Sequence, residues 1–118
     1  MSNILVTDDA AFMRKILADI LIKMGHTVEE AVDGKDAVNK SLAKDYDLIT
    51  LDITMPNLDG IQALKSIKSS KPTQKCVMIS AMGQQAMVVD AIKSGASDFI
   101  VKPFQPDRVQ EAIIKVLS

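Results

Sequence analysis

The sequence predicts an α/β domain built on a doubly wound, five-stranded parallel sheet. Two observations lead to this class. Short apolar runs alternate with longer segments of helical spacing five times along the 118 residues. Five strand–helix units in a row imply parallel strands with helices on both faces of the sheet. No linker, low-complexity segment or charge block divides the chain, so residues 1–118 are interpreted as one domain with no output domain.

The first half of the chain predicts three strands and two helices. Asn3–Thr7 is the first apolar run, and the segment from about Ala10 to Met24 follows it. That segment carries apolar residues at helical spacing: Phe12, Ile16, Ile20, Leu17, Leu21 and Met24. Gly25 is placed to end the helix, because glycine tolerates a left-handed backbone. The next elements are a weaker strand at 26–31, a helix after Asp33-Gly34 with Ala37, Val38 and Leu42, and a strand at Leu48–Leu51, apolar on both faces.

The second half predicts the remaining two strands and three helices. Gly60–Ser69 is helical, with Ile61, Leu64 and Ile67 in phase. Cys76–Ser80 is the fourth strand, Gln84–Lys93 the fourth helix and Asp98–Val101 the fifth strand. Pro106 stands where a final helix can begin, with Val109, Ile113 and Val116 on one face.

The order of the strands follows from general rules of connection. Right-handed crossovers leave few arrangements for five parallel strands. One of them is the flavodoxin-like order 2-1-3-4-5, which places the first and third strands at the point where the winding reverses. Ligands of such sheets bind beyond the carboxyl ends of the strands near that point.

Composition excludes several classes of function. Lys and Arg number 14 and Asp and Glu 15, so the strong basic bias of a nucleic-acid binder is missing. Residues 1–60 hold 11 acidic and 6 basic side chains, and residues 61–118 hold 4 and 8. The neighbouring bases Lys65, Lys68, Lys71 and Lys75 are interpreted as a solvated helix face and turn rather than a partner-binding patch.

Single residues and the chain start complete this picture. Cys76 lies in an apolar run and is expected to be a buried thiol. One histidine, His26, makes neither a transition-metal cluster nor a catalytic triad. No signal peptide or membrane span is predicted, so a reducing cytoplasm is the expected location and no membrane contact is expected.

Polar residues follow four of the five predicted strands. They are Asp8 with Asp9, Asp52, Ser80 and Lys102. Each has an ordinary structural explanation: an aspartate or serine can cap the next helix, and Asp52 or Lys102-Pro103 can form a turn. The second strand ends in no such group, and Glu30 and Asp33 are interpreted as ordinary surface residues.

Together these residues indicate chemistry. A pair of like charges about 4 Å apart costs on the order of 4 kcal/mol at an effective dielectric constant near 20, so three carboxylates at one crevice need a cation or a proton. Oxygen ligands without thiolate or imidazole favour Mg²⁺. One of the paired aspartates is then a ligand, and the other orients water on the metal. Asp52 can act as a phosphoryl-accepting nucleophile, while Lys102 and the Ser80 hydroxyl contact phosphoryl oxygens.

Four blocks of the sequence resemble bacterial two-component response-regulator receiver domains: "VTDDAAFMR", "DLITLDITMPNLDG", "VMISAMG" and "DFIVKPF". The resemblance implies that Asp52 is the phosphoacceptor. It implies that Asp9 binds Mg²⁺ directly, that Asp8 does so directly or through water, and that Thr54 offers its backbone carbonyl. Mn²⁺ is expected to substitute. Ser80 and Lys102 would contact the phosphoryl group. Receiver domains share the 2-1-3-4-5 order, so the predicted topology is not independent of this resemblance.

Further roles are implied by the same resemblance. Phe99, with Ser80, matches the switch residues of the family; without the resemblance, Phe99 would be interpreted as a half-buried strand residue. Pro103 stands where a cis Lys–Pro bond is usual. The side chains of Thr54 and Met82 occupy positions that affect the lifetime of the phosphate.

Within the family, "DAAFMRK", "SAMGQQAMV" and "KPFQPDRV" look most like CheY-type chemotaxis regulators. Such a protein is not a conventional enzyme: it takes a phosphoryl group from a CheA-like sensor histidine kinase, or from a small phosphodonor, and then loses it. The implied output partner is a protein such as a flagellar motor switch protein, and a phosphatase is another implied partner. A monomer is expected. The expected contact surface includes Val88, Val89 and Lys93, Phe99 and the last helix.

Several alternatives stay open at the level of sequence. The chain could be a phosphorelay intermediate, or a receiver cut from a larger DNA-binding regulator. A haloacid-dehalogenase-type phosphatase would need a second aspartate where Thr54 stands. A nucleotide or flavin binder would need a glycine-rich phosphate loop after the first strand, where "TDDAAF" offers carboxylates. The remaining alternative is a binding module that works without phosphorylation.

Overall fold

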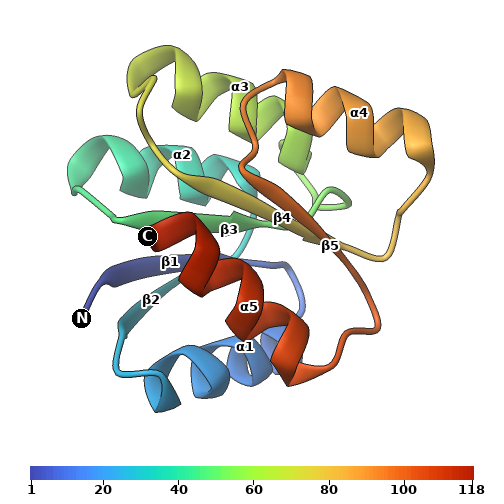
Figure 1. The fold of residues 1–118 in the computed structure, drawn as a ribbon. Coiled ribbons are helices and arrows are strands. Elements are labelled where there is room, and N and C mark those ends of the chain that lie inside the picture. Colours follow the sequence, from blue (N-terminus) through green and yellow to red (C-terminus); the bar gives the residue numbers. More distant parts are fainter.

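The computed structural model describes all residues 1–118 and contains one parallel five-stranded sheet in the order β2-β1-β3-β4-β5. This is the predicted topology. The strands are β1 (Asn3–Thr7), β2 (Thr27–Ala31), β3 (Leu48–Leu51), β4 (Cys76–Ser80) and β5 (Asp98–Val101). The helices are α1 (Ala11–Lys23), α2 (Gly34–Ala43), α3 (Gly60–Ser70), α4 (Gln85–Lys93) and α5 (Pro106–Leu117). Helices α1 and α5 cover one face of the sheet, and α2, α3 and α4 cover the other (Figure 1).

The core consists of two apolar clusters, one on each face of the sheet. Side chains of a strand alternate between its two faces. Accordingly, Leu5 of β1 belongs to the cluster beneath α2, α3 and α4, while Ile4 and Val6 belong to the cluster beneath α1 and α5. All three residues are fully buried. β1 therefore needs apolar residues at successive positions, which explains the continuous run that was visible in the sequence.

The apolar spacing of α1 predicts a wider buried face than the helix has in the structure. Leu17, Ile20 and Leu21 are buried as expected, but Phe12 is 68% exposed and Ile16 is 44% exposed. The sheet covers only one side of a helix, and the apolar residues of α1 extend beyond that side. Leu42 of α2, 57% exposed, differs from expectation for the same reason.

The ends of the helices are set by backbone conformation and by capping. Gly25 has φ of +95°, the left-handed backbone expected after α1. Helix α1 has Ala10 as its N-cap and α4 has Gln84, and neither end has a side-chain cap. The structural alternatives in which Asp8 or Asp9 caps α1 and Ser80 caps α4 are therefore wrong. Asp33 and Asp59 do cap their helices, α2 and α3. None of the five helices has the length and apolar character needed to cross a membrane.

Candidate metal and phosphoryl-transfer site

Parallel pairing brings the predicted site residues to one edge of the sheet. Thr7 of β1 pairs with Leu51 of β3, so the next residues, Asp8 and Asp52, emerge side by side. Ser80 ends β4 opposite Val101 of β5, and Lys102 follows immediately. The backbone N–H of Lys102 donates to the Ser80 carbonyl at 2.8 Å, which fixes the lysine at the same edge.

Three carboxylates form the centre of this site. Asp8, Asp9 and Asp52 each offer an oxygen, and these oxygens lie within 4.8 Å of one another. Asp8 is only 1% exposed and Asp52 7%, whereas Asp9 is exposed and makes no ion pair. Like charges this close and this poorly hydrated repel one another, so the fold must supply positive charge.

Lys102 supplies part of that charge. Its Nζ lies 2.6 Å from Asp8 Oδ2 and 3.2 Å from Asp52 Oδ2. Burial by itself would lower the pKa of Lys102, but the hydrogen bond to Asp8 and the charges of Asp52 and Asp8 outweigh it, so the pKa is raised. The side chain is therefore a fixed ammonium cation beside Asp52, the predicted nucleophile.

The remaining contacts orient Asp8. Its Oδ1 accepts a hydrogen bond of 2.9 Å from the Ala10 N–H. Arg14 donates from Nη1 to the Asp8 carbonyl at 2.8 Å and from Nε to Glu30 at 2.9 Å. Sequence reasoning missed Arg14, and the only signal was a cation on the first turn of the helix that follows the aspartate pair. Arg14 holds the backbone of the acidic segment against β2.

The residues present fit a divalent cation. Three carboxylates and one ammonium carry a net charge of −2, which one divalent ion neutralises. The donor set holds oxygen atoms and no thiolate or imidazole, the preference of Mg²⁺. Asp8, Asp9 and Asp52 are the side chains that could hold it, and the backbone carbonyl of Thr54, two residues after Asp52, is the predicted fourth protein ligand.

Ser80, Thr54 and Met82 come from the end of β4 and from the loops after β3 and β4. Ser80 is buried, and its Oγ accepts a hydrogen bond of 3.2 Å from the Met82 N–H. The Thr54 hydroxyl donates to Met82 Sδ at 3.0 Å, which links the loop after β3 to the loop after β4. The predicted phosphate-lifetime pair is thus in direct contact. Its effect on that lifetime stays a prediction.

The predicted switch residue Phe99 is buried rather than half-buried. It is 8% exposed and belongs to the core cluster against which Met87 and Val88 of α4 pack. The Lys102–Pro103 peptide bond is cis. The switching role of Phe99 and of Ser80 stays a prediction.

Other residues singled out in the sequence lie away from this edge. The His26 ring accepts a hydrogen bond of 3.2 Å from the Ser2 N–H through Nδ1. Burial raises the pKa of the Cys76 thiol to about 12, so it is a neutral core group. Lys71 pairs with Asp45 at 3.0 Å and Lys65 with Asp90 at 3.9 Å, as solvated helix and turn residues do.

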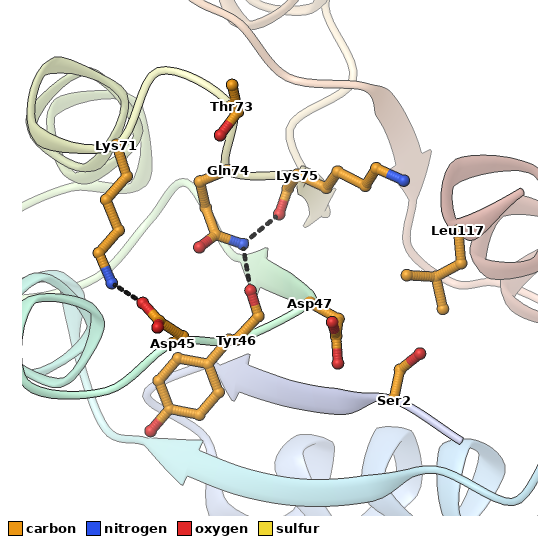
Figure 2. Close-up of a pocket in the computed structure, with 9 residues that line it drawn as sticks. All are labelled: Ser2, Asp45, Tyr46, Asp47, Lys71, Thr73, Gln74, Lys75 and Leu117. Atoms are coloured by element: carbon orange, nitrogen blue, oxygen red, sulfur yellow. Dashed lines mark hydrogen bonds and ion pairs between the residues drawn. The ribbon is translucent and has the colours of Figure 1, made fainter.

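A pocket of about 500 Å³ lies at the opposite, amino-terminal edge of the sheet (Figure 2). Its lining includes Asp45, Lys71, Gln74 and Leu117. The Gln74 amide donates from Nε2 to the carbonyls of Tyr46 and Lys75, at 3.0 and 3.2 Å. The bond to Tyr46 ties the loop before β3 to the loop before β4. None of the carboxylates of the site lines this pocket.

A family model described as the response regulator receiver domain matches residues 4–114. The chain therefore belongs to the response-regulator receiver-domain family. It is similar to the chemotaxis protein CheY of Bacillus subtilis, with 58% identity over 117 residues that cover 98% of each chain. CheY of Thermotoga maritima is 55% identical over 115 residues, which cover 97% of this chain and 96% of the relative.

Solved structures agree with this assignment. The chain superposes with a TM-score of 0.93 and 37% identity on a structure titled as the CheX–CheY–BeF3–Mg complex from Borrelia burgdorferi, covering 98% of this chain and 89% of that one. Receiver domains of this family bind Mg²⁺ at an aspartate cluster, and they are regulators rather than conventional enzymes. The phosphatase and flavin-binding alternatives are thereby set aside, and two-component chemotaxis signalling is the supported context.

Proposed function

We propose that this protein is a single-domain response regulator that accepts a phosphoryl group on Asp52 and thereby changes its affinity for a partner protein in chemotaxis. The observation that carries the proposal is the position of Asp52, beside two further carboxylates and 3.2 Å from the Lys102 ammonium. This cluster of carboxylates does not stabilise the fold, because replacing one of its charged side chains by a neutral one would reduce their mutual repulsion. It has a clear value for phosphoryl transfer.

In the proposed reaction, a carboxylate oxygen of Asp52 attacks phosphorus in a phosphohistidine of the donor kinase. The phosphorus–nitrogen bond breaks, its electron pair stays on the histidine ring, and Asp52 becomes an acyl phosphate. Lys102 already lies within reach of Asp52 and pairs with a phosphoryl oxygen. The Ser80 hydroxyl donates to another oxygen. A bound Mg²⁺ supplies charge neutralisation and alignment of the transferring group.

The proposed output surface includes α4, β5 and α5. Val89 and Ile92 of α4 are 43% and 47% exposed, and Val101 of β5 is 48% exposed. Val88 instead packs partly against the core, so Val89 and Ile92 are the apolar residues available to a partner. Phosphorylation adds about −1.5 to −2 units of charge at Asp52. Ser80 would then move toward the phosphoryl group, and a coupled movement of the Phe99 ring, which lies behind α4, would shift the output surface between two conformations.

The proposed partners follow from the family and its relatives. A CheA-like histidine kinase is the phosphodonor, and a flagellar motor switch protein is the output partner. The structural relative is titled as a complex of CheY with CheX, and a CheX-like phosphatase is therefore proposed as a third partner. We place this signalling in the cytoplasm, with the protein as a monomer. Two alternatives are a phosphorelay intermediate and a receiver cut from a larger DNA-binding regulator. Identifying the partners that the protein binds distinguishes these alternatives from the proposal.

The experiment that tests the proposal is intact-mass spectrometry after addition of acetyl phosphate, with and without Mg²⁺. The wild-type protein is expected to gain one phosphoryl group in a Mg²⁺-dependent manner, and Asp52→Asn none. Asp45→Asn is a matched control, because Asp45 is an exposed aspartate at the opposite edge of the sheet. Absence of an adduct in the wild type under every condition would identify a binding module that works without phosphorylation.

A further inference from the structure

The N-terminus of α2 is connected to the loop that follows the phosphoacceptor. Asp33, the N-cap residue of α2, uses both carboxylate oxygens. Oδ1 accepts from the Asp36 N–H at 2.8 Å, which caps the helix. Oδ2 accepts from the side-chain amide of Asn57 at 2.7 Å, and Asn57 lies five residues after Asp52. One side chain therefore joins a helix end to the loop that leaves β3.

The backbone of Asn57 is suited to this contact. Its φ is 70°, and it is the one residue other than glycine with a positive φ. Asparagine is among the few residues that adopt this left-handed region readily. The next residue, Leu58, lies so close to α2 that a Cβ on Gly34 would be 2.0 Å from the Leu58 carbonyl oxygen. The loop is thus pressed against the helix end as well as hydrogen-bonded to it.

The other end of the same loop is fixed at the phosphoacceptor itself. The Gly60 N–H donates to the Ile53 carbonyl at 2.8 Å. A Cβ on Gly60 would lie 1.9 Å from the Asp52 carbonyl oxygen. Residues 53–57 are therefore held between two close backbone contacts, and Thr54, whose carbonyl is the predicted metal ligand, lies between them.

We propose that Asp33 and Asn57 are a positioning pair that holds the loop so that the Thr54 carbonyl faces the cation site. The inference rests on the proposed function, since it concerns the Mg²⁺ of that same site. It gives the left-handed Asn57 and the second oxygen of Asp33 a purpose that helix capping does not require. Outer partners of metal ligands commonly tune metal affinity in this way.

The electrostatics of Asp33 agree with a carboxylate that stays ionised for both contacts. The hydrogen bond from the Asp36 N–H, and then that from Asn57, hold the pKa of Asp33 below its ordinary value. A cap alone needs one acceptor oxygen, which serine or asparagine also provides. The pair can therefore be separated from the cap by substitution.

The test compares the Mg²⁺ affinity of a single and a double variant with that of the wild type, measured by isothermal titration calorimetry with the metal alone. Asn57→Asp places two carboxylates against each other. It is expected to weaken Mg²⁺ binding about threefold to tenfold, the equivalent of one hydrogen bond. The added negative charge by itself would favour the cation, so the expected direction is opposite to that of simple electrostatics.

The double variant Asp33→Asn with Asn57→Asp is the matched control. It has the net charge of the wild type, keeps a side-chain acceptor for the Asp36 N–H and reverses the donor and acceptor of the pair. Wild-type Mg²⁺ affinity is expected to return. The proposal is overturned if Asn57→Asp binds Mg²⁺ as tightly as the wild type, or if the double variant stays weak, since the defect would then come from the change at position 57 alone and not from the broken pair.

Folding and function are monitored separately. Urea unfolding checks each variant, and Asn57→Gly, which keeps the left-handed backbone but removes the amide, replaces Asn57→Asp if that variant does not fold. Asn57→Gly is expected to weaken Mg²⁺ binding, and unchanged binding would overturn the proposal. A wild-type protein that neither binds Mg²⁺ nor gains a phosphoryl group would contradict the proposed function. If the wild-type protein binds Mg²⁺ and gains a phosphoryl group, and Asn57→Asp binds Mg²⁺ as tightly, only the positioning pair would be contradicted.

Discussion

The four charged side chains of the site are not equivalent. Asp8 and Asp52 are nearly buried and share the ammonium of Lys102, whereas Asp9 is exposed and has no cationic partner. In the absence of metal, Lys102 compensates the two aspartates that desolvation penalises most. The negative charge left for a divalent ion to neutralise lies mainly on Asp9, with the remainder on Asp8 and Asp52, which share the one Lys102 ammonium.

Asp9→Asn is expected to remove the stabilisation by Mg²⁺ without loss of stability in its absence. A ligand at 100 times its dissociation constant stabilises a folded protein by about 2.7 kcal/mol, so Mg²⁺ is expected to raise the unfolding temperature of the wild type. The substitution removes a ligand and also a repulsive charge, so metal-free stability should be equal or higher. Thermal unfolding with and without MgCl₂ measures both effects.

The control for this substitution is Asp19→Asn. Asp19 is an exposed aspartate on α1, paired with Lys15 at 3.4 Å and outside the acidic cluster. It should keep the full Mg²⁺ response. Should Asp9→Asn show the same rise in unfolding temperature as the wild type, Asp9 is not a ligand.

At the level of single residues, the sequence predicted the members of the site that lie at the ends of strands. Asp8, Asp52 and Lys102 follow strands and Ser80 ends one, and the topology implies how these strands pair, so their convergence could be inferred. Arg14 could not be inferred, because its contact with Glu30 depends on how α1 sits against β2. Asp33, interpreted as an ordinary surface residue, was underestimated: its link to Asn57 joins segments 24 residues apart.

Two helix ends depend on glycine, at positions that differ in how closely other parts of the backbone approach. Gly25 and Gly60 both stand at helix ends but for different reasons. Gly25 has a left-handed backbone in open space, where no atom lies within 4 Å of an added Cβ. Gly60 begins α3 directly against the backbone of Asp52. The first glycine is needed for conformation and the second for space.

Alanine at these two positions is expected to separate the two causes. Gly25→Ala should lose about 1–2 kcal/mol of unfolding free energy, the cost of a left-handed alanine. Gly60→Ala should lose more, because its Cβ would lie 1.9 Å from the Asp52 carbonyl oxygen and backbone atoms cannot move aside easily. Urea unfolding of both variants measures the difference.

Helix propensity makes the opposite prediction for Gly60. Alanine is favoured over glycine within a helix by about 1 kcal/mol, so a stabilised Gly60→Ala variant would show that the loop after β3 can move away. Acetyl phosphate labelling of the same variant then shows whether Asp52 has been displaced, since reduced labelling is expected.

Element types were predictable, but the faces of the helices were less so. The alternation of apolar runs and helical spacing identified all five strands and all five helices, with boundaries shifted by a residue or so. The exposure of Phe12 and Ile16 was not predictable, because periodicity shows which residues share a side of a helix but not how wide a strip the sheet covers. Tertiary packing decides that width.

The molecule as a whole has two sheet edges with different roles. The carboxyl edge gathers the charged side chains of the candidate site, and the amino edge is held by hydrogen bonds and an ion pair (Figure 2). Gln74 is only 7% exposed and donates to two carbonyls there, while Lys71 pairs with Asp45 nearby. Stability and function are therefore expected to respond to substitution at opposite ends of the strands.

Gln74→Leu is expected to lower the unfolding free energy by about 1–3 kcal/mol, because the buried carbonyl of Tyr46 loses its donor. Mg²⁺ affinity should be unchanged. Thr73→Ala, in the same loop but exposed, should change stability by no more than about 0.5 kcal/mol. Urea unfolding and calorimetry measure the two properties, and a Gln74→Leu variant with altered Mg²⁺ affinity would contradict this division between the edges.

Lys102 and Asp8 are separated by 94 residues, so their ion pair joins the last strand to the first. Through Asp52, the pairing also reaches the middle of the chain. Until β5 has docked, Asp8 and Asp52 lack the ammonium of Lys102 beside them. Under the proposed function, the chain is therefore expected to accept a phosphoryl group only when folding is complete, and partly folded molecules are expected to remain unphosphorylated.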